Sequence, residues 1–374
     1  MEKEKLIIYP YDGEFTSIIR HSNLLCNYEV TGLISPGGWG LSGRDAGEAD
    51  YGSKLGITVT NDFDESIKLC DTVLFSDSRT QMDFEKFIMP KVSKAVGMGK
   101  NLIFTIPLTN DAFDKIEKEC INGGVYFKYF NNVCRQDESQ EVAGEYNFLY
   151  DINTPVIFVL GIGDKANKFE VQLALRENVM KMGYRVSQIG TRGYCELLGF
   201  HSFPQFMYSN NLSESSKIIL FNQFIKKLEN ENPDVIIIGI PGGIMPFNNK
   251  LTNNFGIVAY EASQAVAPDS AVFSCYYADY YNEYFVKMVD TARYRLGCKV
   301  DCFNMANSEL DWLNSKDLNK MVYTSLDSKF IDEKIKKYKG LDTPVFNVLN
   351  SKGASGMAEC VINRLSDYGK TESI

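Results

Sequence analysis

One short turn in the sequence combines glycine, lysine and asparagine in a pattern that can bind a phosphate group. It lies between an apolar run, residues 156–160, and a stretch whose apolar residues recur with helical spacing. Glycines let the backbone approach a phosphate closely, and a lysine where the helix begins can reach the terminal phosphate oxygens. The candidate binding residues in this turn are Gly161, Gly163, Asp164, Lys165, Asn167 and Lys168.

The turn has the context of a P-loop, but it matches few letters of the P-loop pattern. With Lys168 as the phosphate lysine, GxxxxGK[ST] requires glycine at 162 and 167 and serine or threonine at 169; the chain has Ile162, Asn167 and Phe169. Asn167 can adopt a positive φ angle, whereas Phe169 cannot ligate magnesium. We therefore predict that the turn binds an anion or a nucleotide, ATP or GTP, and no metal. The alternative is a tight strand-to-helix turn that binds nothing.

A second candidate turn follows the apolar run of residues 235–238 and holds Gly242 and Gly243. P-loop proteins place a metal-binding aspartate at the carboxyl end of a neighbouring strand. The aspartate of this stretch, Asp234, precedes the strand instead. We include Gly242 and Gly243 in the predicted nucleotide site, where they offer only backbone groups, and we expect no metal ligand there.

Two loops near the N-terminus are weaker candidates for binding. The glycine-rich stretch 35–47 carries Trp39, which can stack on a ligand, and Arg44, which can bind an anion. A flexible surface loop pinned by Trp39 is the alternative. The segment 12–17 has a single glycine and no GxGxxG pattern, so it does not indicate NAD binding.

The chain has few histidines and scattered cysteines, which limits the metal sites that it could form. The only two histidines, His21 and His201, are distant in sequence, which excludes a histidine-rich metal site. We predict that His201 is a packed or capping residue. Cys298 and Cys302 would lie about 13 Å apart on a strand, so we expect them to be structural rather than to share an ion.

A tyrosine-rich stretch leads into one of the predicted helices. Tyr277, Tyr281, Tyr284 and Met288 fall on one helical face. This face either packs in the core or meets a peptide or a second subunit, which leaves a homo-oligomer open. Asp279 is the predicted N-cap of the helix.

Length and composition set the frame for these sites. The chain has 374 residues, which favours two domains, and a net charge of −9, which disfavours nucleic acid as a partner. No apolar run approaches the roughly 18 residues that span a bilayer, and the N-terminus has no signal-peptide pattern. Nine cysteines, an odd number scattered along the chain, indicate reduced thiols. We predict a cytoplasmic protein that does not contact membranes.

Strand and helix patterns alternate along both halves of the chain, as in βαβ units. The predicted strands are residues 6–9, 30–35, 72–76, 102–106, 156–160, 184–189, 235–240, 271–275, 299–303, 320–324 and 345–349. The predicted helices are residues 62–69, 84–96, 112–122, 171–182, 213–228, 254–265, 280–296, 329–338 and 355–368. An acidic stretch at 137–153 suggests a boundary near residue 150. We predict an α/β protein with two doubly wound parallel-sheet domains: a Rossmann-like domain at 1–150 and a P-loop NTPase-like domain at 151–374.

Three segments together resemble a known family. They are the first helix ending Ile-Ile-Arg-His-Ser22, the loop Gly-Ile-Gly-Asp-Lys-Ala-Asn-Lys-Phe leading to Gln-Leu-Ala-Leu-Arg176, and the turn Gly-Ile-Pro-Gly-Gly243. Across the whole chain they are similar to the peptide-maturation-system proteins, which are encoded beside radical-SAM enzymes and small precursor peptides in bacterial natural-product clusters. The resemblance implies a precursor peptide, or the maturation enzymes of the same pathway, as partners.

These observations lead to one functional hypothesis and two alternatives. The first is an accessory or scaffold protein of ribosomal-peptide maturation with a degenerate nucleotide- or anion-binding P-loop. The second is an active ATP-dependent enzyme of ligase or kinase type that modifies a peptide, with Lys165 and Lys168 on the phosphates. The third, an oxidoreductase that binds a dinucleotide in the N-terminal domain, has the least support.

Overall fold

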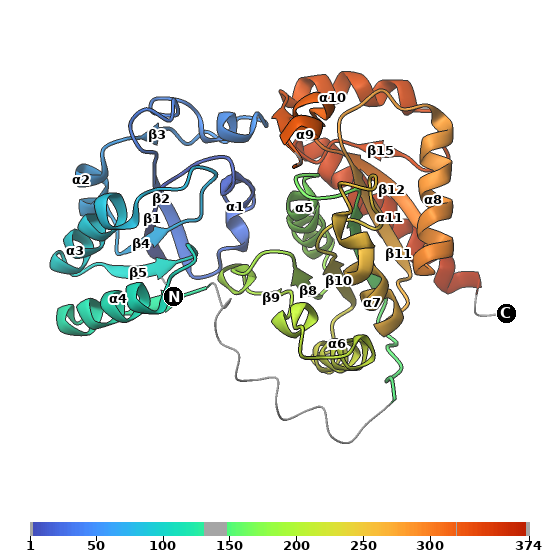
Figure 1. The fold of residues 1–374 in the computed structure, drawn as a ribbon, viewed down its shortest axis with the longest axis horizontal. Helices are drawn as coiled ribbons and strands as arrows, with labels where there is room; N and C mark the ends of the chain where they lie inside the picture. Colours follow the sequence, from blue (N-terminus) through green and yellow to red (C-terminus); the bar gives the residue numbers. More distant parts are fainter. Residues whose placement is uncertain (1–2, 131–147, 319, 372–374) are drawn as a thin grey trace. The chain divides into compact units, whose positions relative to one another are not determined.

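The computed structural model describes residues 3–130, 148–318 and 320–371 (Figure 1). The chain divides into two compact units: residues up to 130 together with Gly193–Gly199 belong to the first, and the remaining described residues belong to the second. The ring of Tyr194 packs 5.6 Å from the ring of Phe15, and both side chains are buried. The domain boundary near residue 150 stays a prediction. Most of the acidic stretch 137–153, on which that prediction was based, lies outside the described residues.

The first unit is built on a sheet of six parallel strands in the order β3-β2-β1-β4-β5-β6, the order of the Rossmann fold. The strands are β1 (Glu4–Tyr9), β2 (Tyr28–Ile34), β3 (Val59–Thr60), β4 (Thr72–Phe75), β5 (Asn101–Phe104) and β6 (Phe127–Tyr129). The predicted strands are confirmed, with ends shifted by a few residues. The two edge strands, β3 and β6, are too short to leave a pattern in the sequence.

Helices α2, α3 and α4 supply apolar residues to one face of this sheet. The helices of the unit are α1 (Thr16–Arg20), α2 (Phe63–Ser66), α3 (Met89–Gly97) and α4 (Asn110–Gly123). The helix predicted at 84–96 is confirmed, but its winding changes: a π-helical turn spans Phe84–Ile88, and α3 follows without interruption, with Pro90 in its first turn. Proline lacks a backbone N–H, so regular α-helical hydrogen bonding cannot pass through Pro90, near which the winding changes.

The second unit contains a sheet of seven parallel strands in the order β15-β12-β11-β7-β10-β8-β9. They are β7 (Val156–Gly161), β8 (Val186–Gly190), β9 (His201–Ser202), β10 (Val235–Gly239), β11 (Ser270–Cys275), β12 (Val300–Met305) and β15 (Val345–Phe346). Strand β7 lies in the centre between β11 and β10, and all six of its residues are buried. An uninterrupted apolar run is what a strand covered on both faces requires.

Helices cover both faces of the second sheet (Figure 1). Helices α5 and α11 pack on one face, and α6, α7, α8 and α10 pack on the other. The helices of this unit are α5 (Lys168–Lys181), α6 (Glu214–Glu229), α7 (Ile257–Ala265), α8 (Asn282–Leu296), α9 (Trp312–Leu318), α10 (Ser328–Ile335) and α11 (Ser351–Thr371). Helix α7 begins three residues later than predicted because Asn254 and Phe255 have positive φ angles.

One predicted strand of the second sheet was wrong. The segment predicted as a parallel strand at 320–324 forms β14 (Tyr323–Ser325), which pairs antiparallel with β13 (Ser308–Leu310) in a separate ribbon that encloses α9. The ribbon follows β12 directly, so it lies at the edge of the sheet where the strands end. The side chains of β14 alternate between two faces, as in any strand. A parallel strand of the main sheet and an antiparallel strand of a separate ribbon therefore differ only in the strand with which they pair.

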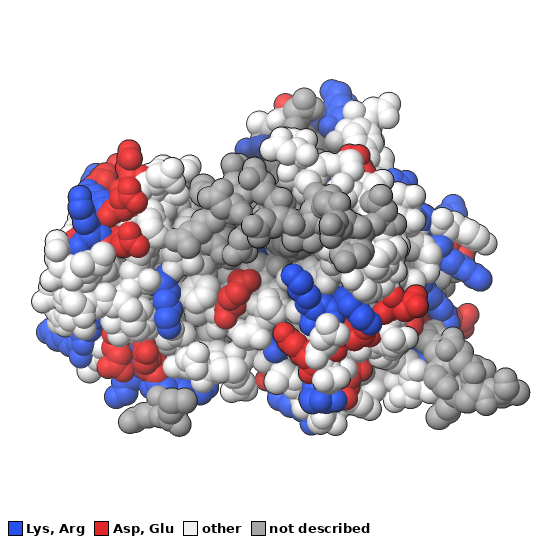
Figure 2. Space-filling model, turned by 90° about the horizontal axis from the view of Figure 1, so that it is seen from below, with Lys and Arg blue, Asp and Glu red and all other residues white. Residues whose placement is uncertain are grey.

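Two observations concern the surface. No helix within the described ranges combines the length and apolar character needed to cross a membrane. On the described part of the face in Figure 2, acidic and basic side chains are interspersed and no broad basic surface forms.

Candidate functional site

The predicted phosphate-binding turn lies at the carboxyl end of the central strand β7 and leads directly into α5. Asn167 is the residue before the helix, with φ of 54°, and Lys165 also has a positive φ of 58°. Asn167 thus adopts the positive φ angle that this residue type can accommodate. Two left-handed residues so close together bend the backbone into a tight curve around the start of the helix.

Several backbone N–H groups of this turn have no partner in the protein. Within the described residues, the N–H groups of Gly163, Asp164 and Lys168 find no hydrogen-bond acceptor, although Gly163 and Lys168 are buried residues. Buried N–H groups are nearly always paired with protein, water or ligand. Because the helix start adds its positive dipole end, the turn is suited to an anion.

Lys168 is folded back over the turn. Its Nζ donates a hydrogen bond to the carbonyl oxygen of Gly242. Its aliphatic stem packs closely against Gly161, where an added Cβ would lie 2.7 Å from Lys168 Cδ. The side chain is buried, with 7% of its surface exposed. Burial lowers the pKa of Lys168 to about 8; the charge of Asp164 opposes this shift and that of Arg192 adds to it.

The glycine turn after β10 packs against the turn after β7. A Cβ on Gly243 would be 2.5 Å from the carbonyl oxygen of Ile162, so only glycine fits there. The amide of Asn253 donates to the carbonyl oxygens of Ile162 and Met245, each at 3.0 Å. The structure thus brings the predicted glycines at 242 and 243 together with the turn that carries Lys168.

Three side chains that sequence reasoning did not place at the site hold the turn from the other side. Ser274 Oγ donates a hydrogen bond to the carbonyl oxygen of Ala166. The hydroxyl of Tyr276 donates one to the carbonyl oxygen of Asp164 at 2.6 Å. Asn167 Nδ2 donates to Oδ1 of Asn307 at 2.9 Å. Ser274, Tyr276 and Asn307 lie at or just after the carboxyl ends of β11 and β12. That position was the only feature of the sequence that could have placed them at the site.

The residues present fit a phosphate group and do not fit a magnesium site of the P-loop kind. Asp234 precedes β10, away from the turn, and its carboxylate binds the guanidinium of Arg185 at 3.0 Å. The ring of Phe169 packs 5.8 Å from the guanidinium of Arg192. Among the described residues, no group of three or more His, Cys, Asp or Glu side chains could hold a metal ion. A bound phosphate would be held by the N–H groups of Gly163, Asp164 and Lys168 and by the Lys168 ammonium.

In the first unit, the carboxylate of Asp12, in the loop after β1, binds backbone N–H groups of the protein itself. Asp12 accepts hydrogen bonds from the backbone N–H groups of Glu14 at 2.8 Å and Arg79 at 2.7 Å. A Cβ on Gly13 would be 2.5 Å from the carbonyl oxygen of Ala49. Burial raises the pKa of Asp12. A pyrophosphate would meet a carboxylate here instead of free N–H groups, which argues against a dinucleotide in this unit.

The other candidates at 35–47 and at the histidines have structural partners. The carboxylate of Asp45 accepts hydrogen bonds from three backbone N–H groups, those of residues 47, 55 and 56. Arg44 lies 3.9 Å from Glu48 on the surface. His21 is buried, and the ring of His201 packs edge-on against Phe224 at 5.6 Å, consistent with a packed residue.

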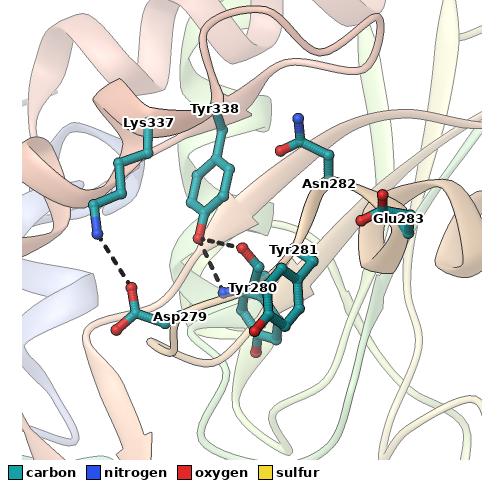
Figure 3. A pocket seen from close by; sticks show the side chains of 7 residues that line it. All are labelled: Asp279, Tyr280, Tyr281, Asn282, Glu283, Lys337 and Tyr338. Atoms are coloured by element: carbon teal, nitrogen blue, oxygen red, sulfur yellow. Dashed lines mark hydrogen bonds and ion pairs between the residues drawn. The ribbon is translucent and has the colours of Figure 1, made fainter.

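A cavity of about 490 Å³ opens beside the start of α8, outside the predicted site (Figure 3). It is lined by Asp279, Tyr280, Tyr281, Asn282, Glu283, Lys337 and Tyr338. Asp279 is not the N-cap that we predicted, because Tyr281 holds that position and the carboxylate of Asp279 pairs with Lys334 and Lys337. Tyr284 stacks on Tyr280 with ring centroids 4.0 Å apart, whereas Tyr281 is 83% exposed. The predicted tyrosine face is therefore only partly packed.

Comparisons with known proteins identify the fold. No family model matches the chain, and no curated protein matches it. A DUF1611 family protein from Anabaena variabilis is similar over 96% of this chain and 100% of its own, with a TM-score of 0.55 and 12% identity. Cobyrinic acid a,c-diamide synthase from Mycobacterium smegmatis, solved with ADP and magnesium, has a TM-score of 0.31 at 10% identity and covers 57% of this chain and 96% of its own. Homoserine dehydrogenase from S. aureus has a TM-score of 0.28 at 10% identity, over 35% of this chain and 34% of its own. The chain therefore has the two-domain α/β fold of the DUF1611 protein, and none of these three structures is described as a peptide-maturation protein.

Proposed function

We propose that this protein binds the phosphate groups of a nucleotide, ATP or GTP, in the turn between β7 and α5. The observation that carries the proposal is the buried Lys168 side chain, folded over a turn in which the N–H groups of two buried residues, Gly163 and Lys168, have no acceptor in the described protein. An anion bound in the turn would pair with the Lys168 ammonium and accept hydrogen bonds from these N–H groups. This is the chemistry of phosphate sites at helix starts.

The nucleotide acts as a bound ligand rather than as a substrate for hydrolysis. Phosphoryl transfer in P-loop proteins needs a hydroxyl after the lysine and a carboxylate at the end of the neighbouring strand to hold magnesium. Phe169 and Gly239 occupy these two positions. The chain retains the groups that hold phosphate and has lost those that hold the cation.

Binding is coupled to a proton. The pKa of Lys168 lies near 8 because the side chain is buried, so part of the population is neutral at slightly alkaline pH. A phosphate next to Nζ favours the ammonium and raises this pKa. Nucleotide binding at pH 8 to 9 therefore takes up a proton.

The test is calorimetric titration and thermal unfolding with ATP and GTP, each with and without magnesium. A ligand at about 100 times its Kd stabilises the native state by about 2.7 kcal/mol. Lys168→Met removes this stabilisation, whereas Lys181→Met, at the exposed far end of the same helix, retains it. Equal binding by the two variants, or no binding by the native protein, contradicts the proposal. Magnesium-dependent turnover that is lost with Lys168 supports the ATP-dependent enzyme instead.

The sequence resemblance supports an accessory role in ribosomal-peptide maturation. In this role the nucleotide-bound protein holds a precursor peptide or a maturation enzyme of its pathway. Affinity purification of the tagged chain from cells that express the neighbouring genes tests this role. Recovery of those partners in equal amounts with the Lys168→Met variant would separate partner binding from the nucleotide.

A further inference from the structure

The ribbon that follows β12 is fastened to the phosphate-binding turn. Asn307, at its base, accepts a hydrogen bond from Asn167 in the turn and donates one to the carbonyl oxygen of Leu326 at 3.0 Å. The hydroxyl of Tyr323 on β14 lies 3.0 Å from that of Tyr276, which also contacts the turn. These bonds fix helix α9, which the ribbon encloses, beside the turn.

A row of aromatic rings leads from the turn to α9. A Cβ on Gly163 would be 2.6 Å from the hydroxyl of Tyr276 and 3.1 Å from the ring of Phe247. The rings of Phe247 and Tyr276 are nearly parallel, with centroids 6.1 Å apart. Phe247 then meets Trp312 edge-on, with centroids 6.2 Å apart. Trp312 is thus separated from the turn by a single aromatic side chain.

Trp312 leaves a large part of its ring uncovered. It is the first residue of α9 and is 53% exposed, although its partner Phe247 is half-buried. The indole is held on one side by Phe247 and open on another. An amphipathic ring of this kind beside an anion-binding turn is suited to a ligand that carries both phosphate and a flat ring.

We propose that Trp312 is the platform on which the base of the bound nucleotide stacks. This inference rests on the proposed phosphate site and adds its selectivity: the ligand is a nucleotide rather than inorganic phosphate or polyphosphate. Stacking of a base on an aromatic ring contributes to affinity and tolerates different bases, because every base has a π-face. Trp312 therefore distinguishes nucleotides from plain polyphosphates and accepts adenine and guanine alike.

The chain offers a direct optical test because it contains only two tryptophans, Trp39 and Trp312. In a Trp39→Phe protein, the emission of Trp312 is followed during titration with ATP, GTP and inorganic tripolyphosphate. We expect ATP and GTP to quench the emission and tripolyphosphate to leave it unchanged. Calorimetry of the same protein should give tighter binding of ATP than of tripolyphosphate.

Substitution separates the platform from the phosphate site. Trp312→Leu should weaken ATP binding about tenfold, within the range expected for one stacked base, and leave the affinity for tripolyphosphate unchanged. Trp312→Phe should retain most of the ATP affinity. Tyr294→Leu, which removes another exposed aromatic residue near the far end of α8, serves as the matched control and should change neither affinity.

The remaining outcomes overturn the inference in distinguishable ways. Equal affinity for ATP in the native and Trp312→Leu proteins refutes the platform while the phosphate site stands. Loss of tripolyphosphate binding in Trp312→Leu shows a structural role for the indole. Quenching by a tyrosine-containing peptide but not by ATP assigns the ring to a peptide. If the native protein binds neither ATP nor tripolyphosphate, the phosphate site fails and the platform fails with it.

Discussion

The ammonium of Lys168 donates a hydrogen bond to the carbonyl oxygen of Gly242, 74 residues further along the chain. The bond joins the helix start after the central strand β7 to the turn after its neighbour β10. The lysine is therefore already positioned at the turn, with its charge shared between one carbonyl oxygen and a site suited to an anion. Its protonation and the stability of the second unit are linked.

The first prediction concerns pH and Lys168→Met. The folded-state pKa of Lys168 is lowered to about 8 by burial, so the unfolded state binds more protons between about pH 8 and 10.5. The free energy of unfolding of the native protein should rise with pH across this window relative to Lys168→Met, by at most about 3 kcal/mol. Urea unfolding of both proteins from pH 7 to 10, followed by Trp312 emission in a Trp39→Phe background, measures the difference. A difference that does not vary with pH contradicts the shifted pKa.

The second prediction concerns the contact between the two turns. Gly243→Ala places a methyl group against the carbonyl oxygen of Ile162, which should lower the free energy of unfolding by about 1 to 3 kcal/mol. Gly340→Ala meets no atom within 4 Å and serves as the control; it should change stability by less than about 0.5 kcal/mol. Thermal unfolding compares the two. Similar melting temperatures would show that the turns are not in close contact.

The third prediction isolates the left-handed conformation of Asn167. Asn167→Gly and Asn167→Ala both remove the hydrogen bond to Asn307, but only alanine is strained at φ of 54°. Alanine should therefore be less stable than glycine by about 1 to 2 kcal/mol. Asn167→Gly should keep its affinity for ATP because the backbone path is unchanged. An alanine variant as stable as the glycine variant would rule out the positive φ.

The fourth prediction concerns the first unit. Arg20 and Asp50 form an ion pair at 2.6 Å with side chains only 9% and 13% exposed. Asp50→Ala leaves a buried guanidinium uncompensated and should lower stability by about 3 kcal/mol. Glu48→Ala breaks an exposed contact with Arg44 at 3.9 Å and should change stability by less than about 0.5 kcal/mol. Urea unfolding followed by Trp39 emission in a Trp312→Phe protein reports on this unit; equal effects of the two substitutions would contradict the prediction.

The fold could be predicted where the sequence pattern reports burial. Strands β7 and β10 are covered on both faces, so their runs of Val, Ile and Leu were visible in the sequence. The antiparallel pairing of β13 and β14 was not visible, because a three-residue strand carries no sign of its partner. The late start of α7 followed from positive φ angles at Asn254 and Phe255, which no composition rule indicates for phenylalanine.

The candidate site could be predicted only on the side that is continuous in sequence. Glycine and lysine spacing located the turn, and the helix after it was periodic. The residues that hold the turn from β11 and β12 lie more than a hundred positions away: Ser274, Tyr276 and Asn307. A serine or asparagine at the end of a strand is common, and only the strand order identifies these as neighbours of β7.

The packing of Tyr194 on Phe15 has a consequence for how the protein is made. The ribosome synthesises Phe15 early, but the aromatic ring that completes its surroundings comes from residues 193–199, which are translated only after β7, α5 and β8. The first unit therefore lacks this contact, and Phe15 lacks its aromatic neighbour, until part of the C-terminal half has been synthesised. A truncated protein that ends at residue 150 would lack this contact permanently and should be prone to aggregation.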